Sequence, residues 1–240
     1  GPAGQIMVHK IDSGVEVEPG TPGRDFDDEK AKDELIPITF NNNYQKSRKI
    51  YGVQANAVQF AMAEEYLADA LNMTKQGRQY SGLACMVDEG TDFGNTDVVT
   101  EESAINFLIA IRQKVKDNKG KANFAMVSTG IYASLLKKLG LATIMDPAVQ
   151  SGELMKRFGL SIIECNSFDK TKAKFYNNAG TLKTIDLTAV DYIVGYNEAV
   201  SILDNFETYR LRDSENFSGT KAQVEYNTAF KVNSPKQLII

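Results

Sequence analysis

Residues 18–33, EPGTPGRDFDDEKAKD, contain almost no side chain that could join a hydrophobic core. Proline–glycine turn signals begin this segment, and acidic residues dominate the part that follows. Partly alternating apolar and polar residues flank it at 5–17 and 34–40, which predicts a two-stranded arm with an acidic tip. Because an isolated hairpin buries too little apolar surface to be stable alone in water, we expect the arm to lie on another surface.

The next element is predicted to be a long amphipathic helix over residues 53–71. Its apolar residues recur at spacings of three and four, which gives a helix of roughly five turns, about 28 Å long, that ends near Gly77. A second helix is predicted after Thr100, its expected N-cap. Glu101 and Glu102 would then stand in the first turn, where the helix dipole favours anions.

Short strands alternate with helices in the middle of the chain, and longer strands close it. A helix is expected after a cap at Ser128 or Thr129, and short helical pieces are expected at 151–159 and 199–203. The mixture of patterns predicts an α+β protein. The expected strands are 123–127, 160–165, 173–177, 190–195, 208–213, 221–232 and 236–240.

The overall charge limits the partners of the chain. The 240 residues carry a formal net charge of −4, which argues against a dedicated nucleic-acid surface. No apolar run approaches the roughly 20 residues that span a bilayer, and the amino terminus shows no signal-sequence pattern, so we expect no membrane partner.

The residues that usually carry catalysis are scarce. His9 is the only histidine, so one chain cannot supply a histidine-based metal site or a hydrolase triad. Cys85 and Cys165 form no paired-cysteine motif and are expected to be reduced and buried. The glycines match no nucleotide-binding motif, so we expect no catalytic residue, no cofactor and no enzyme activity.

One loop keeps an enzymatic alternative open. Residues 88–97, DEGTDFGNTD, combine oxygen ligands with glycines, although the spacing of a calcium-binding EF-hand is absent. A metal-dependent enzyme that uses this acidic loop is therefore the remote alternative. A solvated surface loop explains the same composition.

Several quoted segments, in this order, resemble a known family. They are VEPGTPGRDF, IPITF, QKSRKI, TEESAINFLIAIRQKV, ANFAMVSTGIYASLLKKLG, GELMKRFGLSIIECNSF, DYIVGYNEAVSILDNFETYRLRD and VEYNTAFKVNSP. Together they are similar to the major capsid proteins of tailed bacteriophages, the Hong Kong 97 type, over nearly the whole chain.

The resemblance implies a Hong Kong 97-like fold. It implies an extended E-loop hairpin at 5–48, a peripheral P-domain with the spine helix at 49–79 and 204–240, and an axial A-domain at 80–203. The implied function is that of a major capsid protein, which self-assembles in the bacterial host cytoplasm into the icosahedral shell of a virion. The implied partners are other copies in hexamers and pentamers, scaffold, portal and decoration proteins, and packaged DNA in weak, non-specific contact.

Charged residues are the candidate subunit contacts, since opposite charges on neighbouring subunits tune register and encounter. A second reading is an encapsulin-like compartment, whose shell would enclose a protein cargo instead of DNA. Some members of the capsid family crosslink a lysine to an asparagine, but no pair is assigned here. The candidate contact residues are Arg24, Asp25, Asp27, Asp28, Lys46, Arg48, Lys49, Arg210 and Arg212.

Overall fold

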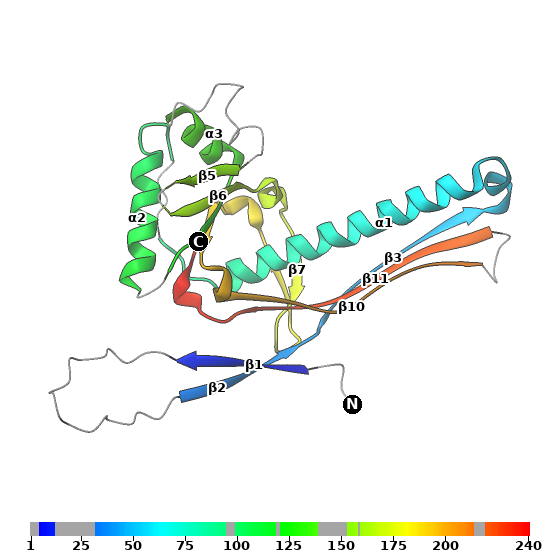
Figure 1. Ribbon diagram of the computed structural model, residues 1–240, viewed down its shortest axis with the longest axis horizontal. Coiled ribbons are helices and arrows are strands. Elements are labelled where there is room, and N and C mark those ends of the chain that lie inside the picture. The colour runs from blue at the N-terminus through cyan, green and yellow to red at the C-terminus, as the bar shows by residue number, and fades with distance from the viewer. Residues whose placement is uncertain are drawn as a thin grey trace.

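The chain folds into an elongated molecule with a compact body at one end (Figure 1). A long helix and a narrow sheet extend from this body together, and a hairpin arm lies below them. The mixture of helices and strands confirms the predicted α+β class. The computed structural model describes residues 5–12, 32–94, 99–118, 121–138, 153–157, 159–213 and 219–240.

The longest element is the helix α1, Gly52–Glu89, with 38 residues. At 1.5 Å per residue it spans about 57 Å. The prediction that it ends near Gly77 is wrong, because Gly77 and Gly82 lie inside the helix and face the sheet. A Cβ atom at Gly77 would lie 3.4 Å from Cδ1 of Tyr44, and one at Gly82 would lie 3.3 Å from Cε1 of Phe230. This close packing of aromatic rings offsets the low helix propensity of glycine.

α1 lies along a three-stranded antiparallel sheet of strand order β10-β11-β3 (Figure 1). The central strand β11 alternates half-buried residues with buried ones such as Ala222, Val224 and Tyr226, which is the pattern of a sheet with one covered face. The strands are β3 Asn42–Tyr51, β10 Val200–Asp213 and β11 Gly219–Val232.

The body contains a five-stranded sheet of strand order β12-β9-β4-β6-β5. Two helices, α2 Ala104–Asp117 and α3 Thr129–Lys138, pack on it through a buried core that includes Leu108, Leu135 and Ile162. The strands are β4 Phe124–Val127, β5 Glu153–Arg157, β6 Leu160–Glu164, β9 Tyr192–Gly195 and β12 Leu238–Ile239.

Two segments predicted to be helical are strands. β5 lies within the expected helical turn at 151–159, and it pairs antiparallel with β6. Gly159, with a φ angle of +74°, allows the tight reversal between these two strands. At 199–203 a single 3₁₀ turn ends at Ala199, and β10 begins at the next residue, where its backbone pairs antiparallel with β11. At both places strand pairing determines the conformation, although the local sequence pattern is helical.

The start of α2 also differs from the prediction. The N-cap residue is Ser103, and Thr100 instead forms hydrogen bonds with Ser103 in the turn before the helix. Glu101 and Glu102 therefore lie in that turn, and both are exposed. The buried face of α2 includes Ala104, Leu108, Ile111 and Val115, which recur at spacings of three and four.

The arm consists of an antiparallel pair of strands, β1 and β2. Its base is fastened by asparagines: Asn178 Oδ1 accepts from the Thr39 amide at 2.8 Å, and Asn178 Nδ2 donates to the Pro37 carbonyl at 2.6 Å. Asn42 likewise bonds both backbone groups of Tyr176, at 2.8 and 2.9 Å. The elements involved are β1 Gln5–Asp12, β2 Lys32–Thr39, β7 Ala173–Tyr176 and β8 Leu182–Ile185. The 3₁₀ turns are η1 Asn166–Asp169, η2 Leu187–Ala189, η3 Asn197–Ala199 and η4 Pro235–Gln237.

Apolar packing completes the attachment of the arm. Ile38 and Phe40, at the end of the arm, pack against Ala229 of β11 and Leu203 of β10. Farther along the arm, Met7 is 56% exposed and Leu35 is 50% exposed. The base of the arm thus belongs to the folded subunit, while apolar side chains beyond it face solvent.

Candidate functional site

The candidate contact residues that the structure describes lie on two strands. Lys46, Arg48 and Lys49 are on β3, whereas Arg210 and Arg212 are on β10. β11 lies between these strands, so folding brings the two basic groups to one sheet. The remaining candidates, Arg24, Asp25, Asp27 and Asp28, lie outside the described residues.

This sheet has two different faces, which we call the helix face and the open face. The helix face is covered by α1 and carries the buried residues of β11, such as Val224. Alternate residues of each strand project from the open face, on the opposite side. Open-face residues are Asn43, Gln45, Ser47 and Lys49 of β3, Lys221, Gln223 and Glu225 of β11, and Thr208, Arg210 and Arg212 of β10.

Three cations cross the open face in one row. The strand register sets Lys49 opposite Lys221, and Lys221 opposite Arg212. Directly opposed Cβ atoms are about 5 Å apart, so the Cβ atoms of the three residues span about 10 Å. Like charges that lie directly opposite one another disfavour strand pairing. Sequence reasoning missed Lys221, although the alternation in KAQVEYN could have indicated it.

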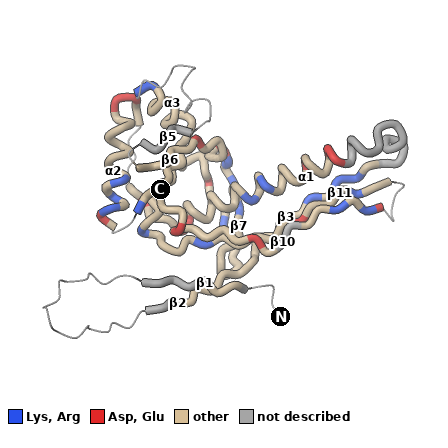
Figure 2. The backbone as a smooth tube through the Cα atoms, viewed as in Figure 1, with Lys and Arg blue, Asp and Glu red and all other residues tan. Residues whose placement is uncertain are grey.

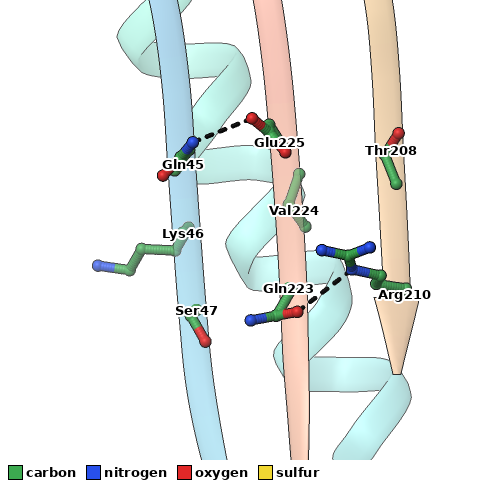
Figure 3. A pocket seen from close by; sticks show the side chains of 8 residues that line it. All are labelled: Gln45, Lys46, Ser47, Thr208, Arg210, Gln223, Val224 and Glu225. Carbon is green, nitrogen blue, oxygen red and sulfur yellow. Dashed lines mark hydrogen bonds between the residues drawn. The ribbon is translucent and has the colours of Figure 1, made fainter. Parts of the chain in front are cut away.

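Arg210 borders a hollow of about 420 Å³ on the open face, shown in Figure 3. Nε of Arg210 donates to Oε1 of Gln223 at 3.2 Å. Nε2 of Gln45 and Nδ2 of Asn43 both donate to Oε1 of Glu225, at 2.9 and 3.1 Å. Amide and charged groups therefore dominate the hollow, which suits polar side chains of a partner better than an apolar ligand.

Arg48 has a role within the chain. Its Nη2 lies 2.5 Å from Oδ2 of Asp69 on α1, and its guanidinium carbon lies 5.9 Å from the ring centroid of Tyr66. The side chains of Arg48 and Asp69 are 39% and 47% exposed, so water screens the ion pair and its contribution to stability is small. Arg48 thus fastens β3 to α1, while its neighbour Lys49 projects from the open face.

Two further ion pairs of the helix face were not foreseen from the sequence. Nη2 of Arg78 on α1 lies 2.6 Å from Oδ2 of Asp204 on β10. Oε2 of Glu89 accepts from Nζ of Lys231 at 3.0 Å and from the Val232 amide at 2.9 Å. Each pair joins residues more than 120 positions apart in the chain, so no local pattern points to it. Both contacts fasten the carboxyl-terminal half of α1 to the sheet.

The two thiols lie in the core. Cys85 and Cys165 are both buried, as predicted, and they form no disulfide. Burial raises the pKa of both thiols, and the nearby Glu89 carboxylate raises that of Cys85 further. Both thiols are therefore protonated at neutral pH, a state in which cysteine is a poor nucleophile.

Asp88 and Asp92 of the acidic loop each contact another group of the chain. Oδ1 of Asp92 accepts from the Gly94 amide at 2.8 Å, and Oδ1 of Asp88 lies 3.7 Å from Nζ of Lys183. Asp97 lies outside the described residues. Across the part of the chain that the structure describes, no three side chains of the His, Cys, Asp or Glu type gather as a metal site would require. In that same part, no helix has both the length and the apolar character needed to cross a bilayer.

The arrangement of a long helix, a narrow sheet, a body and an arm is shared with solved viral structures. The capsid structure of the cyanophage P-SCSP1u matches all of this chain and 82% of its own chain, with a TM-score of 0.69 and 14% identity. This chain has the fold of a tailed-phage capsid protein. The acid-stable capsid structure of the Helicobacter pylori bacteriophage KHP30 matches all of this chain and 83% of its own, at a TM-score of 0.65 and 11% identity. The predicted Hong Kong 97-like fold is thereby confirmed.

A third similar structure bears on the alternative reading. The virus-like particle from Pyrococcus furiosus matches all of this chain and 85% of its own chain, with a TM-score of 0.58 and 13% identity. No family model matches the sequence, and no curated protein matches it either. The capsid fold is therefore recognised here from the arrangement of the backbone.

Proposed function

We propose that this protein is the major capsid protein of a tailed bacteriophage. The observation that carries the proposal is the match of the whole chain to phage capsid structures, which includes the arm and the long helix as well as the body. Many copies would form the icosahedral shell that encloses the phage genome. The protein would then reside in the virion after assembly in the cytoplasm of the bacterial host.

The arm supports this proposal on physical grounds. Ile6, Met7 and Leu35 are 44–56% exposed, although the base of the same hairpin is buried against the sheet. Exposed apolar side chains on a projecting hairpin gain stability when a second molecule covers them. Interlocked copies in a shell would provide that cover, and each arm would lie on a neighbouring subunit.

The open face of the sheet is the proposed polar part of the subunit contact. Lys49, Arg210 and Arg212 project from it, and Lys46 borders its hollow. The acidic tip that the sequence predicts for the arm, with Asp25, Asp27 and Asp28, is a suitable counterpart in charge within a neighbouring copy. The ion pair between Arg48 and Asp69 supports a role for Arg48 inside the subunit instead.

The domain division remains a prediction: an arm at 5–48, a P-domain at 49–79 and 204–240, and an A-domain at 80–203. Strand pairing supports an earlier end of the arm, near Thr39, because β3 pairs with β11 rather than with the arm. The proposed assembly partners are other copies in hexamers and pentamers, together with scaffold, portal and decoration proteins. A chain of net charge −4 would hold packaged DNA only weakly and without sequence preference.

Electron microscopy of the purified protein tests the proposal. The protein is expressed in bacteria, and assembly is followed by negative staining over a range of salt and protein concentrations. We expect closed shells or rings of five and six subunits. Featureless monomers under every condition, both for the protein alone and after co-expression with the gene products encoded next to it, would contradict the proposal.

The second candidate is the shell subunit of a protein-filled compartment. The similarity to the virus-like particle from Pyrococcus furiosus favours keeping it. Shells purified from their natural source distinguish the two functions. A dominant absorbance at 260 nm that survives nuclease treatment of intact shells indicates packaged DNA, whereas a stoichiometric second protein indicates a compartment.

A further inference from the structure

A groove lies at the carboxyl-terminal part of α2, in the body of the molecule and far from the open face. It has a volume of about 680 Å³. One wall is the outer surface of α2, and the other is formed by residues that precede β4 and follow β9. The residues that characterise it are Ile109, Arg112, Gln113, Lys116, Lys121 and Tyr196.

The groove concentrates positive charge on an acidic chain. Arg112, Lys116 and Lys121 are all exposed, and no carboxylate of the described residues lies within ion-pair distance of them. The helix dipole favours cations in the last turn, which accounts for Lys116. It does not account for Arg112, which lies more than a turn earlier, or for Lys121, which lies beyond the helix. Three cations around one hollow fit an anionic partner group.

The opposite end of the same helix carries the opposite charge. Glu101 and Glu102 are exposed in the turn before α2, and no described cation lies within ion-pair distance of either. Figure 2 shows acidic residues at the upper end of α2 and mostly basic residues along its lower part, where Asp117 ends the helix. The two groups are about 20 Å apart along the helix, so they cannot pair within one molecule. Two copies placed head to tail could pair them.

An exposed apolar side chain completes the surface. Ile109 is 50% exposed on the same stripe of α2 as Arg112 and Lys116, because residues three and four apart share a helix face. Tyr196 forms part of the facing wall. An apolar centre surrounded by charged groups is typical of the core and rim of a protein interface.

We propose that this groove receives the turn containing Glu101 and Glu102 of a second copy of the chain. The contact joins two different surfaces, so repeating it builds a ring when the rotation between successive copies closes. It would be the charge-complementary contact that builds each ring of subunits in the shell. The inference rests on the proposed capsid function and adds the two surfaces that meet.

Charge reversal tests the pairing. The groove variant Arg112→Glu/Lys116→Glu and the turn variant Glu101→Lys/Glu102→Lys should each lower the fraction of protein in rings or shells by about tenfold or more, measured by native mass spectrometry and electron microscopy. The chain that carries all four changes should assemble again, because its groove and turn are complementary once more. A matched control is Lys137→Glu/Lys138→Glu, which makes the same charge change at exposed sites on α3 outside the groove.

Mixing tests the head-to-tail direction. In an equimolar mixture each groove variant can contact only turn variants, so the two must alternate around a ring. The mixture should therefore form six-membered rings and no five-membered rings. Five-membered rings that contain both variants would overturn the head-to-tail geometry.

The remaining outcomes are also decisive. Circular dichroism and urea unfolding check the fold of each variant, and Arg112→Gln/Lys116→Gln replaces any reversal variant that does not fold. Normal assembly of the folded groove variant with loss of binding to a DNA duplex would assign the groove to DNA and overturn the inference, while the capsid function would stand. Normal assembly with unchanged DNA binding would also overturn the inference alone. Failure of the unmodified protein to assemble would instead contradict the capsid function.

Discussion

The helix face and the open face of the three-stranded sheet contain similar charged residues in different surroundings. On the helix face, Arg48 and Arg78 each contact a carboxylate of the same chain. Arg48 joins β3 to α1, and Arg78 joins α1 to β10. On the open face, Lys49, Lys221 and Arg212 stand side by side. Charge on the first face thus joins elements within one subunit, whereas Arg210 and Arg212 on the second face are exposed.

Two consecutive residues show the difference between the two faces most clearly. Arg48 and Lys49 are neighbours on β3, and strand geometry directs their side chains to opposite faces. The basic residues of QKSRK are close together in the sequence, yet the fold directs their side chains to different faces of the sheet. Changes on the helix face should therefore alter the stability of the monomer, and changes on the open face should alter assembly.

The largest effect on stability is expected from Phe230→Ala. Phe230 is 3% exposed on the helix face, and its ring packs on Gly82 of α1. Removing the ring leaves a cavity and should lower the free energy of unfolding of the dissociated monomer by about 3–5 kcal/mol, measured by urea titration. The control is Gln223→Ala on the open face, which should change stability by less than about 0.5 kcal/mol. Equal losses for both variants would remove the distinction between the faces.

Asn42→Ala should have the next largest effect. Asn42 is 4% exposed at the start of β3, and its side chain bonds both the amide and the carbonyl of Tyr176. The alanine variant leaves these backbone groups without partners, which should cost about 1–3 kcal/mol in urea unfolding. Asn43→Ala is the matched control, because the side chain of Asn43 is exposed on the open face. A variant as stable as the unmodified protein would contradict the role of Asn42 in fastening β3 to β7.

High pH should lower the stability of the folded chain because Tyr44, on the helix face, ionises. Burial raises the pKa of Tyr44 from 10.0 to about 12. Since the folded state holds the neutral phenol and the unfolded state ionises first, the stabilising contribution is complete below pH 10 and is lost as the pH rises toward 12. The loss should be about 1.4 kcal/mol per pH unit in that interval. Tyr44→Phe should remove this part of the slope, and an unchanged slope in the variant would refute the assignment.

The smallest effect compares Arg48→Ala with Lys49→Ala. Loss of the half-exposed Arg48–Asp69 pair should lower monomer stability by about 0.2–1 kcal/mol, and the difference should shrink at high salt. Lys49→Ala changes an exposed side chain on the open face and should alter monomer stability by less than about 0.5 kcal/mol. Differential scanning calorimetry at two salt concentrations measures both variants. A larger loss for Lys49→Ala would reverse the assignment of the two faces.

Part of the fold follows directly from local sequence patterns. The arm strands, the buried stripe of α2 and strands such as β4, β6 and β9 all show the expected periodicity. The end of α1 could not be predicted, because Gly77 is kept in the helix by Tyr44 from a strand that precedes it. β5 was missed for a similar reason, since its conformation depends on pairing with β6.

The candidate site shows the same limit. Arg210 and Arg212 were recognised as contact candidates, and alternation along one strand separates Arg48 from Lys49. Lys221 was missed because its position beside these residues comes from the register that sets it between Lys49 and Arg212. Register depends on contacts between distant segments, which a single strand does not specify.

The most direct test of the open face is the double variant Arg210→Glu/Arg212→Glu. Urea unfolding of the monomer and electron microscopy of assembled protein are measured on the same preparation, beside the unmodified chain. We expect an unfolding midpoint within error of the unmodified protein, together with a loss of closed shells. Shells that form in normal number from the double variant would contradict the assignment of the open face to subunit assembly.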